Sequence, residues 1–397
     1  MSENRPQQHV QSADVASTGA AAEARLARLV QMSLPENRNA WALAAKRQGS
    51  RVVGVLDSYV PEEIFHAARI VPYRVLGTES AETPLAEGWR LPDMCRFTNH
   101  VLEAVLSGQV RFLDGMVFTD WDDDERRLYD VCAHVKTLPF NYILHVSRTD
   151  TPRAYDYSTM LLRRLIEALK QQWNVNISDQ AIWDAIALCD RARVLQRELY
   201  DLRRREVPPV SGAEALGIIM ASFYMPRDEY VAELEALMPY LAGRAAPLRN
   251  LSPRLLVVSD HLDFPRYLEI VENEGCVVAM DDLDTGSRHF WNTVGECNGD
   301  PVHALARRYL TRPPDPRMAF WDRQVDQVIT WANQWDIDGI LHLPSLGGFE
   351  RLCCGPYFSR RLEEAGVPFR TFVREYHVAN TGQLRTQVGA FLESLDY

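Results

Sequence analysis

The sequence predicts an α/β protein built from two Rossmann-like, doubly wound parallel-sheet domains joined by long helices. Three observations lead to this prediction. Short apolar, β-branched runs alternate with helical patterns through residues 51–146, and the alternation resumes from residue 254 to the C-terminus. Between these stretches, apolar residues recur at helical spacing over long segments. Such alternation is typical of βαβ units, whose parallel strands are buried on both faces.

Composition is that of a globular protein. The 397 residues are 46% apolar and 24% charged, with a formal net charge of −11. These values suit two or three domains and exclude a wholly disordered chain, while the acidic balance disfavours a nucleic-acid binder. No apolar run reaches the roughly 18–20 residues that span a bilayer, and the N-terminus lacks a signal pattern. The sequence therefore predicts a cytoplasmic protein that binds neither nucleic acid nor membrane.

The first α/β domain is predicted for residues 23–156, after a mobile tail at residues 1–22 whose small, polar residues have almost nothing to bury. Two short helices broken at Pro35 open this domain. A strand is expected at residues 51–56, and the following Pro61, with two carboxylates after it, is typical of a first helical turn. Further strands are expected at residues 72–76, 112–118 and 141–146, with helices between them.

A helical connecting region is predicted for residues 157–250, with Ser178 at the start of its second long helix. The second α/β domain is predicted for residues 251–397. Its strands are expected at residues 254–259, 276–280, 339–342 and 369–373, and its helices at residues 265–274, 321–335, 356–365 and 383–395.

Candidate ligand-binding residues follow the strands, because open parallel sheets bind ligands beyond the carboxyl ends of their strands. They are Asp57–Tyr59, Thr119–Asp124, Ser259–His261, Asp281–Arg288 and Pro344–Gly348. No GxGxxG follows a strand, and neither GxxxxGK[ST] nor GxSxG occurs. The sequence therefore does not support dinucleotide binding, P-loop nucleotide binding or nucleophile-elbow hydrolysis.

Two acidic stretches each allow two interpretations. The run Asp120–Glu125 either favours the positive end of a helix or forms a carboxylate cluster for a cation or for acid–base chemistry. Asp281 and Asp282, with Arg288 after them, either cap a helix and form a structural ion pair or direct the arginine at an anionic ligand.

The histidine and cysteine residues have a structural interpretation. His66 lies beside an apolar helix face, as core histidines do. The seven cysteines are scattered without a CxxC pair, which excludes a disulfide framework and a local zinc or ferredoxin motif. Most are expected to be small buried side chains, namely Cys132, Cys189, Cys276 and Cys297.

Several segments, in order along residues 45–397, resemble the 2-hydroxyacyl-CoA dehydratase and benzoyl-CoA reductase family. Each segment is moderately specific, and their common order strengthens the resemblance. They are Val53–Ala68 with Val71 and Pro72, Phe112–Phe118 with Arg126–Tyr129, Ile177–Arg204, Val207–Gly212, Asp281–Arg288, Ala306–Leu310 and Thr381–Glu393.

The resemblance implies a subunit of a radical-type enzyme complex that acts on acyl-CoA thioesters. It implies a homologous second subunit, a [4Fe-4S] cluster between the two domains, and electrons from a separate ATP-hydrolysing iron-sulfur activator protein. Members either remove water from a 2-hydroxyacyl-CoA through a ketyl radical, as lyases, or reduce an aromatic ring, as oxidoreductases. Both reactions begin with one electron entering a thioester carbonyl system, which suits a low-potential cluster.

The resemblance also implies site residues. The family holds its cluster by three cysteines, and here Cys95 stands at the first position, Asp122 at the second and Gly347 at the third. Asp123 matches the aspartate that follows the second ligand. Asp122, Asp123 and His66 are predicted as catalytic residues, and Ser58, Tyr59 and Arg288 as cofactor-binding residues.

Two hypotheses follow from the incomplete ligand set. In the first, a cluster is held by Cys95, Cys354 (or Cys353) after rebuilding of the loop, and Asp122 as an oxygen ligand, which is feasible but harder than thiolate ligation. In the second, the chain is a cluster-free, non-catalytic partner or scaffold subunit of the same fold.

Overall fold

The computed structural model describes residues 7–91, 94–136, 138–249, 252–295, 299–319, 321–348, 355–378 and 381–395, with side chains from Gly19 onward. It contains two four-stranded, all-parallel sheets, which confirms the predicted fold class. The first sheet has β1 (Arg51–Val55), β2 (Ile70–Arg74), β3 (Gly115–Thr119) and β4 (Asn141–Leu144). The second has β5 (Arg254–Val258), β6 (Val277–Asp282), β7 (Gly339–His342) and β8 (Phe369–Thr371). Each expected strand is found within a few residues of its predicted place.

Both sheets have the same topology. The strand orders are β2-β1-β3-β4 and β6-β5-β7-β8, so that β1 and β5 each have a neighbouring strand on both sides. The chain therefore reverses its direction of travel across the sheet after β2 and again after β6. The carboxyl ends of strands at such a switch point are the usual ligand-binding edge of an open parallel sheet.

Helices cover both faces of the first sheet. One face carries α2 (Pro35–Arg47), α4 (Pro84–Glu87), α5 (Arg96–Leu106) and α6 (Asp123–Val135). Val53, Val55 and Val117 point to the opposite face, where they share an apolar core with helix α3 (Glu62–Ala67) and with two long helices of the middle of the chain. Alternate strand residues thus serve both faces, as expected for a buried parallel sheet.

The middle of the chain is helical, as predicted. It consists of α7 (Pro152–Trp173), α8 (Asp179–Leu202), α9 (Gly212–Ala221) and α10 (Arg227–Gly243). The Ser178 side chain accepts a hydrogen bond from the backbone N–H of Ala181 and so caps α8.

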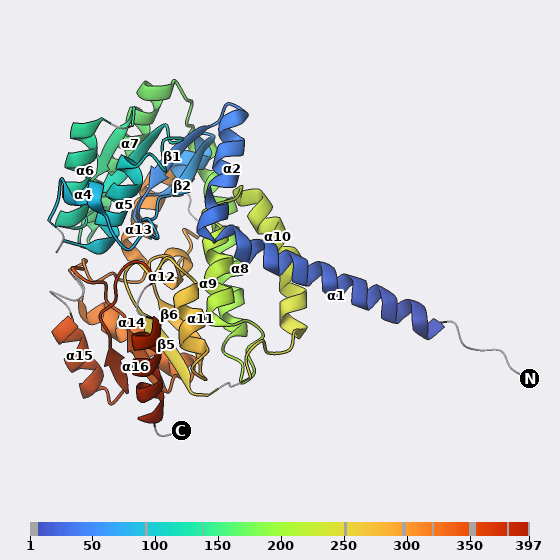
Figure 1. Cartoon of the computed structure of the whole chain (residues 1–397). Coiled ribbons are helices and arrows are strands. Elements are labelled where there is room, and N and C mark those ends of the chain that lie inside the picture. Colours follow the sequence, from blue (N-terminus) through green and yellow to red (C-terminus); the bar gives the residue numbers. More distant parts are fainter. Residues whose placement is uncertain are drawn as a thin grey trace, which may run out of the picture.

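The first helix begins inside the range expected to be a tail. Helix α1 (Gln7–Met32) extends away from the rest of the chain in Figure 1, and its last turns lie against α9 and α10. Leu26 and Leu29 are buried there. Alanine-rich residues before them have high helix propensity, which explains why the helix continues beyond the buried part. Residues 1–6 of the expected tail lie outside the described residues.

One helix of the second half packs on the first sheet. The second sheet is covered by α11 (Arg266–Glu272), α12 (Ser287–Phe290), α14 (Trp321–Gln334), α15 (Gly355–Glu364) and α16 (Thr381–Glu393). Helix α13 (Pro301–Thr311) instead lies against α7, and its Val302, Leu305 and Tyr309 belong to the same apolar core as Val53. The chain thus crosses back to the first α/β unit after β6. The predicted domain boundaries remain a prediction.

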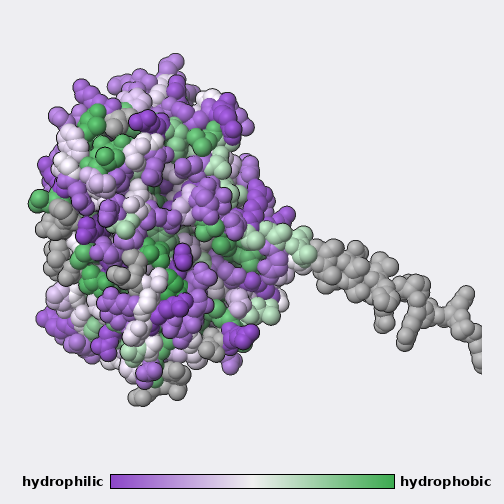
Figure 2. Space-filling model, viewed as in Figure 1, coloured by the Kyte–Doolittle hydropathy of each residue, from purple (hydrophilic) through white to green (hydrophobic). Residues whose placement is uncertain are grey.

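The visible face of the molecule in Figure 2 is mainly polar. On the face shown in Figure 2, hydrophilic side chains predominate and apolar ones form small separate groups. None of the described helices has the length and apolar character that a membrane-spanning segment requires.

A buried carboxylate connects the central helices to the second sheet. Glu272 of α11 accepts hydrogen bonds from the backbone N–H groups of Gly212 (2.6 Å) and Ala213 (3.2 Å) at the start of α9, and from that of Val278 (3.2 Å) in β6. Burial raises the pKa of Glu272 from 4.5 to about 7, although the three N–H donors act in the opposite direction. The acid is thus harder to ionise in the folded chain than in the unfolded chain.

This shift predicts a pH-dependent stability. A raised folded-state pKa gives a contribution that is complete below the unfolded value of 4.5 and is lost as the pH rises through about 7. Between about pH 4.5 and pH 8, the free energy of unfolding of the wild type should fall by about 3 kcal/mol relative to Glu272→Gln. Urea unfolding across this range measures the difference, and parallel curves for the two proteins would contradict it.

Candidate functional site

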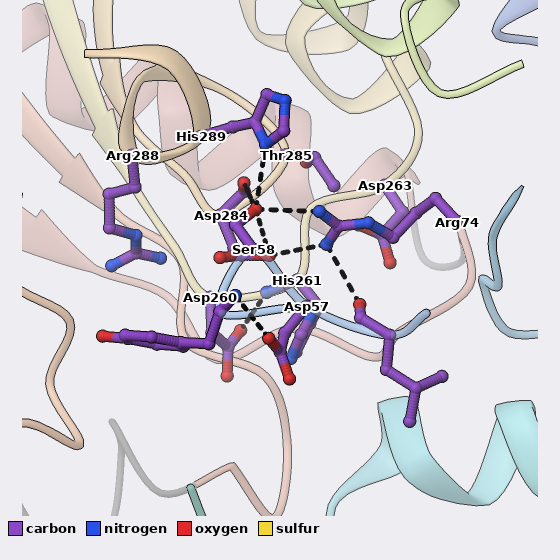
Figure 3. A network of polar contacts seen from close by, with 12 residues as sticks. Asp57, Ser58, Arg74, Asp260, His261, Asp263, Asp284, Thr285, Arg288 and His289 are labelled. Atoms are coloured by element: carbon purple, nitrogen blue, oxygen red, sulfur yellow. Dashed lines mark hydrogen bonds and ion pairs between the residues drawn. The ribbon is translucent and has the colours of Figure 1, made fainter. Parts of the chain in front are cut away.

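The carboxyl ends of the two sheets contact each other. Ser58, which follows β1, donates a hydrogen bond from its hydroxyl to the backbone carbonyl of Asp284, which follows β6, at 3.0 Å. Arg74, the last residue of β2, donates to the Asp284 carboxylate at 2.9 Å and to the Ser58 hydroxyl at 2.8 Å. His289 Nδ1 lies 3.2 Å from the same hydroxyl (Figure 3). We call this region, where residues after strands of both sheets meet, the interdomain site.

Asp284 is the central anion of the interdomain site. One carboxylate oxygen accepts from Arg74, and the other accepts from Arg312 Nη2 at 2.9 Å. Burial opposes ionisation, but Arg312 and Arg74 outweigh it and hold the pKa of Asp284 well below its ordinary value. Asp284 is therefore ionised, and arginines from both halves of the chain neutralise its charge.

Arg312 begins a short segment that enters the interdomain site, residues 312–319, which we call the arginine–proline loop. Its second arginine, Arg317, donates from Nε to Asp122 Oδ2 at 2.8 Å, and its guanidinium carbon lies 4.4 Å from the centre of the Trp121 ring. Asp315 of the same loop lies 3.8 Å from Arg288 Nη1. The loop thus forms ion pairs with residues that follow both β3 and β6.

The structure brings together the three positions that the resemblance assigns to cluster ligands. Cys95 caps α5 and is buried, and the neighbouring Arg96 N–H donates to the carbonyl of Leu346, beside Gly347, at 3.4 Å. Burial, followed by the charge of Asp122, raises the pKa of the Cys95 thiol to about 12. Cys95 therefore lies near both Asp122 and the loop that contains Gly347.

The side chains at these positions do not fit an iron-sulfur cluster. Asp122 uses one oxygen for the N–H of Glu125 (2.7 Å), as the N-cap of α6, and the other for Arg317. Gly347 has no side chain that could bind iron. Its φ of +74° lies in the left-handed region that favours glycine. Among the described residues, no three His, Cys, Asp or Glu side chains form a group that could hold a metal. Cys353 and Cys354 lie outside the described residues.

Two buried acids, Asp57 and Glu125, lie on either side of one hydroxyl beside the interdomain site. The Thr119 hydroxyl lies 2.6 Å from Asp57 Oδ2 and 2.9 Å from Glu125 Oε2. A hydroxyl has one hydrogen to donate, so Thr119 satisfies both oxygens fully only when one of the two acids is protonated. Burial, together with the neighbouring Asp57, raises the pKa of Glu125 well above its ordinary value. Burial, together with the charge of Asp284, raises the pKa of Asp57 as well, so simultaneous ionisation of the two acids is disfavoured.

The contacts between Thr119 and Glu125 predict how substitutions at Glu125 affect stability. Glu125→Gln keeps a donor for the Thr119 hydroxyl and an acceptor for its N–H, and should lower the free energy of unfolding by no more than about 1 kcal/mol. Glu125→Ala leaves those groups buried without partners and should cost about 2–3 kcal/mol. Urea denaturation of both variants measures the two effects, and a glutamine variant as unstable as the alanine variant would show that Glu125 is ionised.

The predicted catalytic residues occupy different places. Asp122 lies in the interdomain site, but the Asp123 side chain is 83% exposed and pairs with Arg126. His66 lies on α3, which packs against α8, and burial with the charge of Arg227 lowers its pKa to about 4. The described contacts do not join His66 or Asp123 to Asp122. Their catalytic roles remain predictions.

The predicted cofactor-binding residues all lie in or beside the interdomain site. Ser58 is held by the Asp284 network, and Arg288 donates to the carbonyl of Ser259 at 2.7 Å and lies 3.5 Å from Asp282. The structure thus has the ion pair that was one of the two interpretations of Arg288. Tyr59 lines a cavity of about 220 Å³ together with Arg312. Cofactor binding by these residues remains a prediction.

Sequence reasoning missed the basic half of the site. It identified the carboxylates that follow strands but not Arg74, Arg312 or Arg317, which neutralise them. The local signal for Arg312 and Arg317 is the segment after Leu310, where two arginines flank three prolines. Its local pattern does not reveal which residues it contacts.

The chain has two parallel-sheet units, and the carboxyl ends of their strands meet at the interdomain site. This arrangement defines a two-unit α/β protein. Residues 57–395 match the family described as 2-hydroxyglutaryl-CoA dehydratase, D-component, and the chain belongs to this family. The resemblance noted in the sequence is thereby confirmed.

Three relatives resemble the chain over most of its length. One of the benzoyl-CoA reductase subunits of Thauera aromatica is 25% identical over 360 residues, covering 87% of this chain and 91% of the relative. The beta subunit of (R)-2-hydroxyglutaryl-CoA dehydratase of Acidaminococcus fermentans is 24% identical, covering 88% and 94%. The (R)-phenyllactyl-CoA dehydratase beta subunit of Clostridium sporogenes is 22% identical, covering 88% and 93%. All three are named as subunits of larger enzymes.

Proposed function

We propose that this chain is a cytoplasmic subunit of a heteromeric complex that acts on a CoA thioester, and that it serves as a cluster-free partner of a homologous subunit. The names of its relatives, which are subunits of dehydratases and of a reductase, support the first part. The observation that carries the second part is the Arg317–Asp122 ion pair at the place where the resemblance implies a cluster.

The burial of the interdomain site supports a non-catalytic role for this chain. Asp284, Arg74 and Arg312 are each at most 3% exposed and are already paired with one another. A substrate entering between the two sheets would have to break these pairs, and an unpaired buried charge typically costs several kcal/mol. The partner subunit would then carry the radical reaction, with electrons from an ATP-hydrolysing activator protein.

A second candidate function is a catalytic subunit of the same type of complex. It would hold a cluster by Cys95, Cys354 or Cys353, and Asp122. The meeting of Cys95, Asp122 and the Gly347 loop favours this candidate. It requires Asp122 to leave Arg317, and the buried ion pair of these two residues opposes that change.

The decisive experiment is anaerobic purification of the chain, alone and with a co-encoded homologous subunit. We expect the two chains to co-purify and the chain alone to contain no iron or acid-labile sulfide, even after reconstitution with ferrous iron and sulfide. Failure to pair with the homologous subunit would contradict the subunit role. A cluster absorption in the isolated chain that is lost in Cys95→Ala, but kept in the matched control Cys189→Ala, would establish the catalytic alternative.

A further inference from the structure

We infer that Arg317 substitutes for a cluster. Its guanidinium pairs with Asp122, the second expected ligand position, and lies close to Cys95, the first. This ion pair connects the arginine–proline loop to the residues that follow β3. The inference deepens the proposed cluster-free subunit role and rests on it. It assigns to Arg317 the role of neutralising Asp122 in the buried interior.

The guanidinium of Arg317 is buried among acidic side chains and an aromatic ring. Its Nε lies 2.8 Å from Asp122 Oδ2, its Nη1 lies 3.7 Å from Asp315 Oδ1, and the Trp121 ring lies beneath the guanidinium carbon at 4.4 Å. The Arg317 side chain is 1% exposed. Asp260, which follows β5, and Cys95 are further groups whose charges act on Arg317. One cation is thus held between residues that follow β3 and β5, next to the expected first ligand.

The arginine–proline loop restricts the backbone around Arg317. Pro313, Pro314 and Pro316 restrict the backbone before it, since the proline ring fixes φ. The backbone N–H of Arg317 donates to Asp315 Oδ1 at 2.9 Å. Restriction of the backbone reduces the conformational entropy that is lost when this segment is ordered.

Arg148 anchors the loop from the first unit. Its Nη1 donates to the carbonyl of Arg317 at 3.2 Å, and its own carbonyl accepts from the N–H of Ala319 at 3.0 Å. Met318, between these two residues, lies in a small apolar cluster with Tyr59 and Trp121. The loop is therefore attached to the first unit both at Arg317 and at the residues that follow it. These attachments keep the Arg317 side chain in the protein interior.

The expected ligand positions suit an ion pair better than a cluster. Asp122 has a carboxylate with two oxygens, of which one caps α6 and the other receives Arg317. At the third position, the left-handed backbone of Gly347 leaves room without supplying a donor. Arginine is suited to such a buried site because its guanidinium is always charged, planar and weakly hydrated. A single thiol, Cys95, remains from the expected set among the described residues.

A double-variant cycle tests the ion pair. Arg317→Met and Asp122→Asn should each lower the urea midpoint of unfolding, and the protein carrying both substitutions should lose clearly less than the sum of the two shifts. Arg361→Met, whose arginine pairs with Asp322 and Asp326 at the surface, is the matched control and should leave the midpoint nearly unchanged. Additive shifts at Arg317 and Asp122 would overturn the inference.

A reconstruction experiment tests the substitution itself. Asp122→Cys with Gly347→Cys restores three thiols around the site, once with Arg317 kept and once with Arg317→Ala. After anaerobic reconstitution with ferrous iron and sulfide, we expect iron, sulfide and the visible cluster absorption in the Arg317→Ala protein and at least a several-fold lower content when Arg317 is kept. Equal loading of the two proteins, or no loading of a folded Arg317→Ala protein, would overturn the inference. Loss of pairing with a homologous subunit would instead contradict the proposed function. The urea midpoints and the iron and sulfide contents are measured on this chain alone, so they would still test the role of Arg317.

Discussion

Replacement of Asp284 by asparagine should lower the free energy of unfolding by about 3–5 kcal/mol, because it removes the shared counter-charge of two buried guanidinium groups. Arg74 and Arg312 each lie 2.9 Å from a different oxygen of this carboxylate. An asparagine side chain has the same shape but no charge, and its amide N–H₂ would face one of the two arginines. Urea unfolding of the purified variant measures the loss.

Two comparisons separate this charge effect from a general loss of packing. In the Asp284→Asn background, Arg74→Met removes one uncompensated cation and should cost much less than it does in the wild type. Asp123→Asn, at an exposed carboxylate of the first unit, should change stability by no more than about 0.5 kcal/mol. Equal, small effects at Asp284 and Asp123 would mean that solvent reaches the interdomain site.

Replacement of Glu63 by glutamine should have an effect of similar size, about 3–5 kcal/mol, where three helices meet. Glu63 of α3 is fully buried, pairs with Arg193 of α8 at 2.6 Å and accepts from the hydroxyl of Tyr309 of α13 at 2.7 Å. This carboxylate therefore connects α13, which comes from the second half of the chain, to α3 and α8. Its loss should weaken the contact between α13 and the first unit, measurable as faster amide hydrogen exchange in α13.

The same residue has a defined pH dependence. Although burial raises it, Arg193 and Arg308 hold the pKa of Glu63 at about 2, below its ordinary value of 4.5. A lowered folded-state pKa gives stability that is complete above 4.5 and is lost as the pH falls toward about 2. The difference in stability between the wild type and Glu63→Gln should therefore shrink as the pH is lowered from about 6 to about 3. A constant difference over this range would contradict the assignment. Glu63 and Glu272 should thus respond to pH in opposite directions.

Local patterns in the chain were sufficient for the strands and for the edge at which the site lies. Each strand is a short apolar run bounded by turn residues, and burial on both faces makes such runs visible in sequence. The residues after the strands, such as Ser58 and Asp122, could be placed at the interdomain site because parallel strands end at a common edge. The order of family-like segments led to the same family as residues 57–395 match.

The basic half of the site could not be predicted in this way. Arg317 contacts Asp122 across 195 positions of the chain, and Arg74 contacts Asp284 across 210. Helical and strand periodicity report the faces of one element and carry no information about which distant element it meets. The exposed side chain of Asp123, next to the buried Asp122, shows the same limit, because a helix start places consecutive carboxylates on different faces.

The sequence alone determined the fold class, the strand positions, the family and the edge of the sheets at which acidic residues gather, since all of these depend on patterns within short segments. Only the tertiary structure decided that α13 returns to the first sheet, that the arginine–proline loop enters between the sheets, and that Asp122 pairs with Arg317. These features depend on the burial of charges, whose cost makes each one require a partner in space. That partner can come from any part of the chain, so the folded chain, and not the local sequence, selects it.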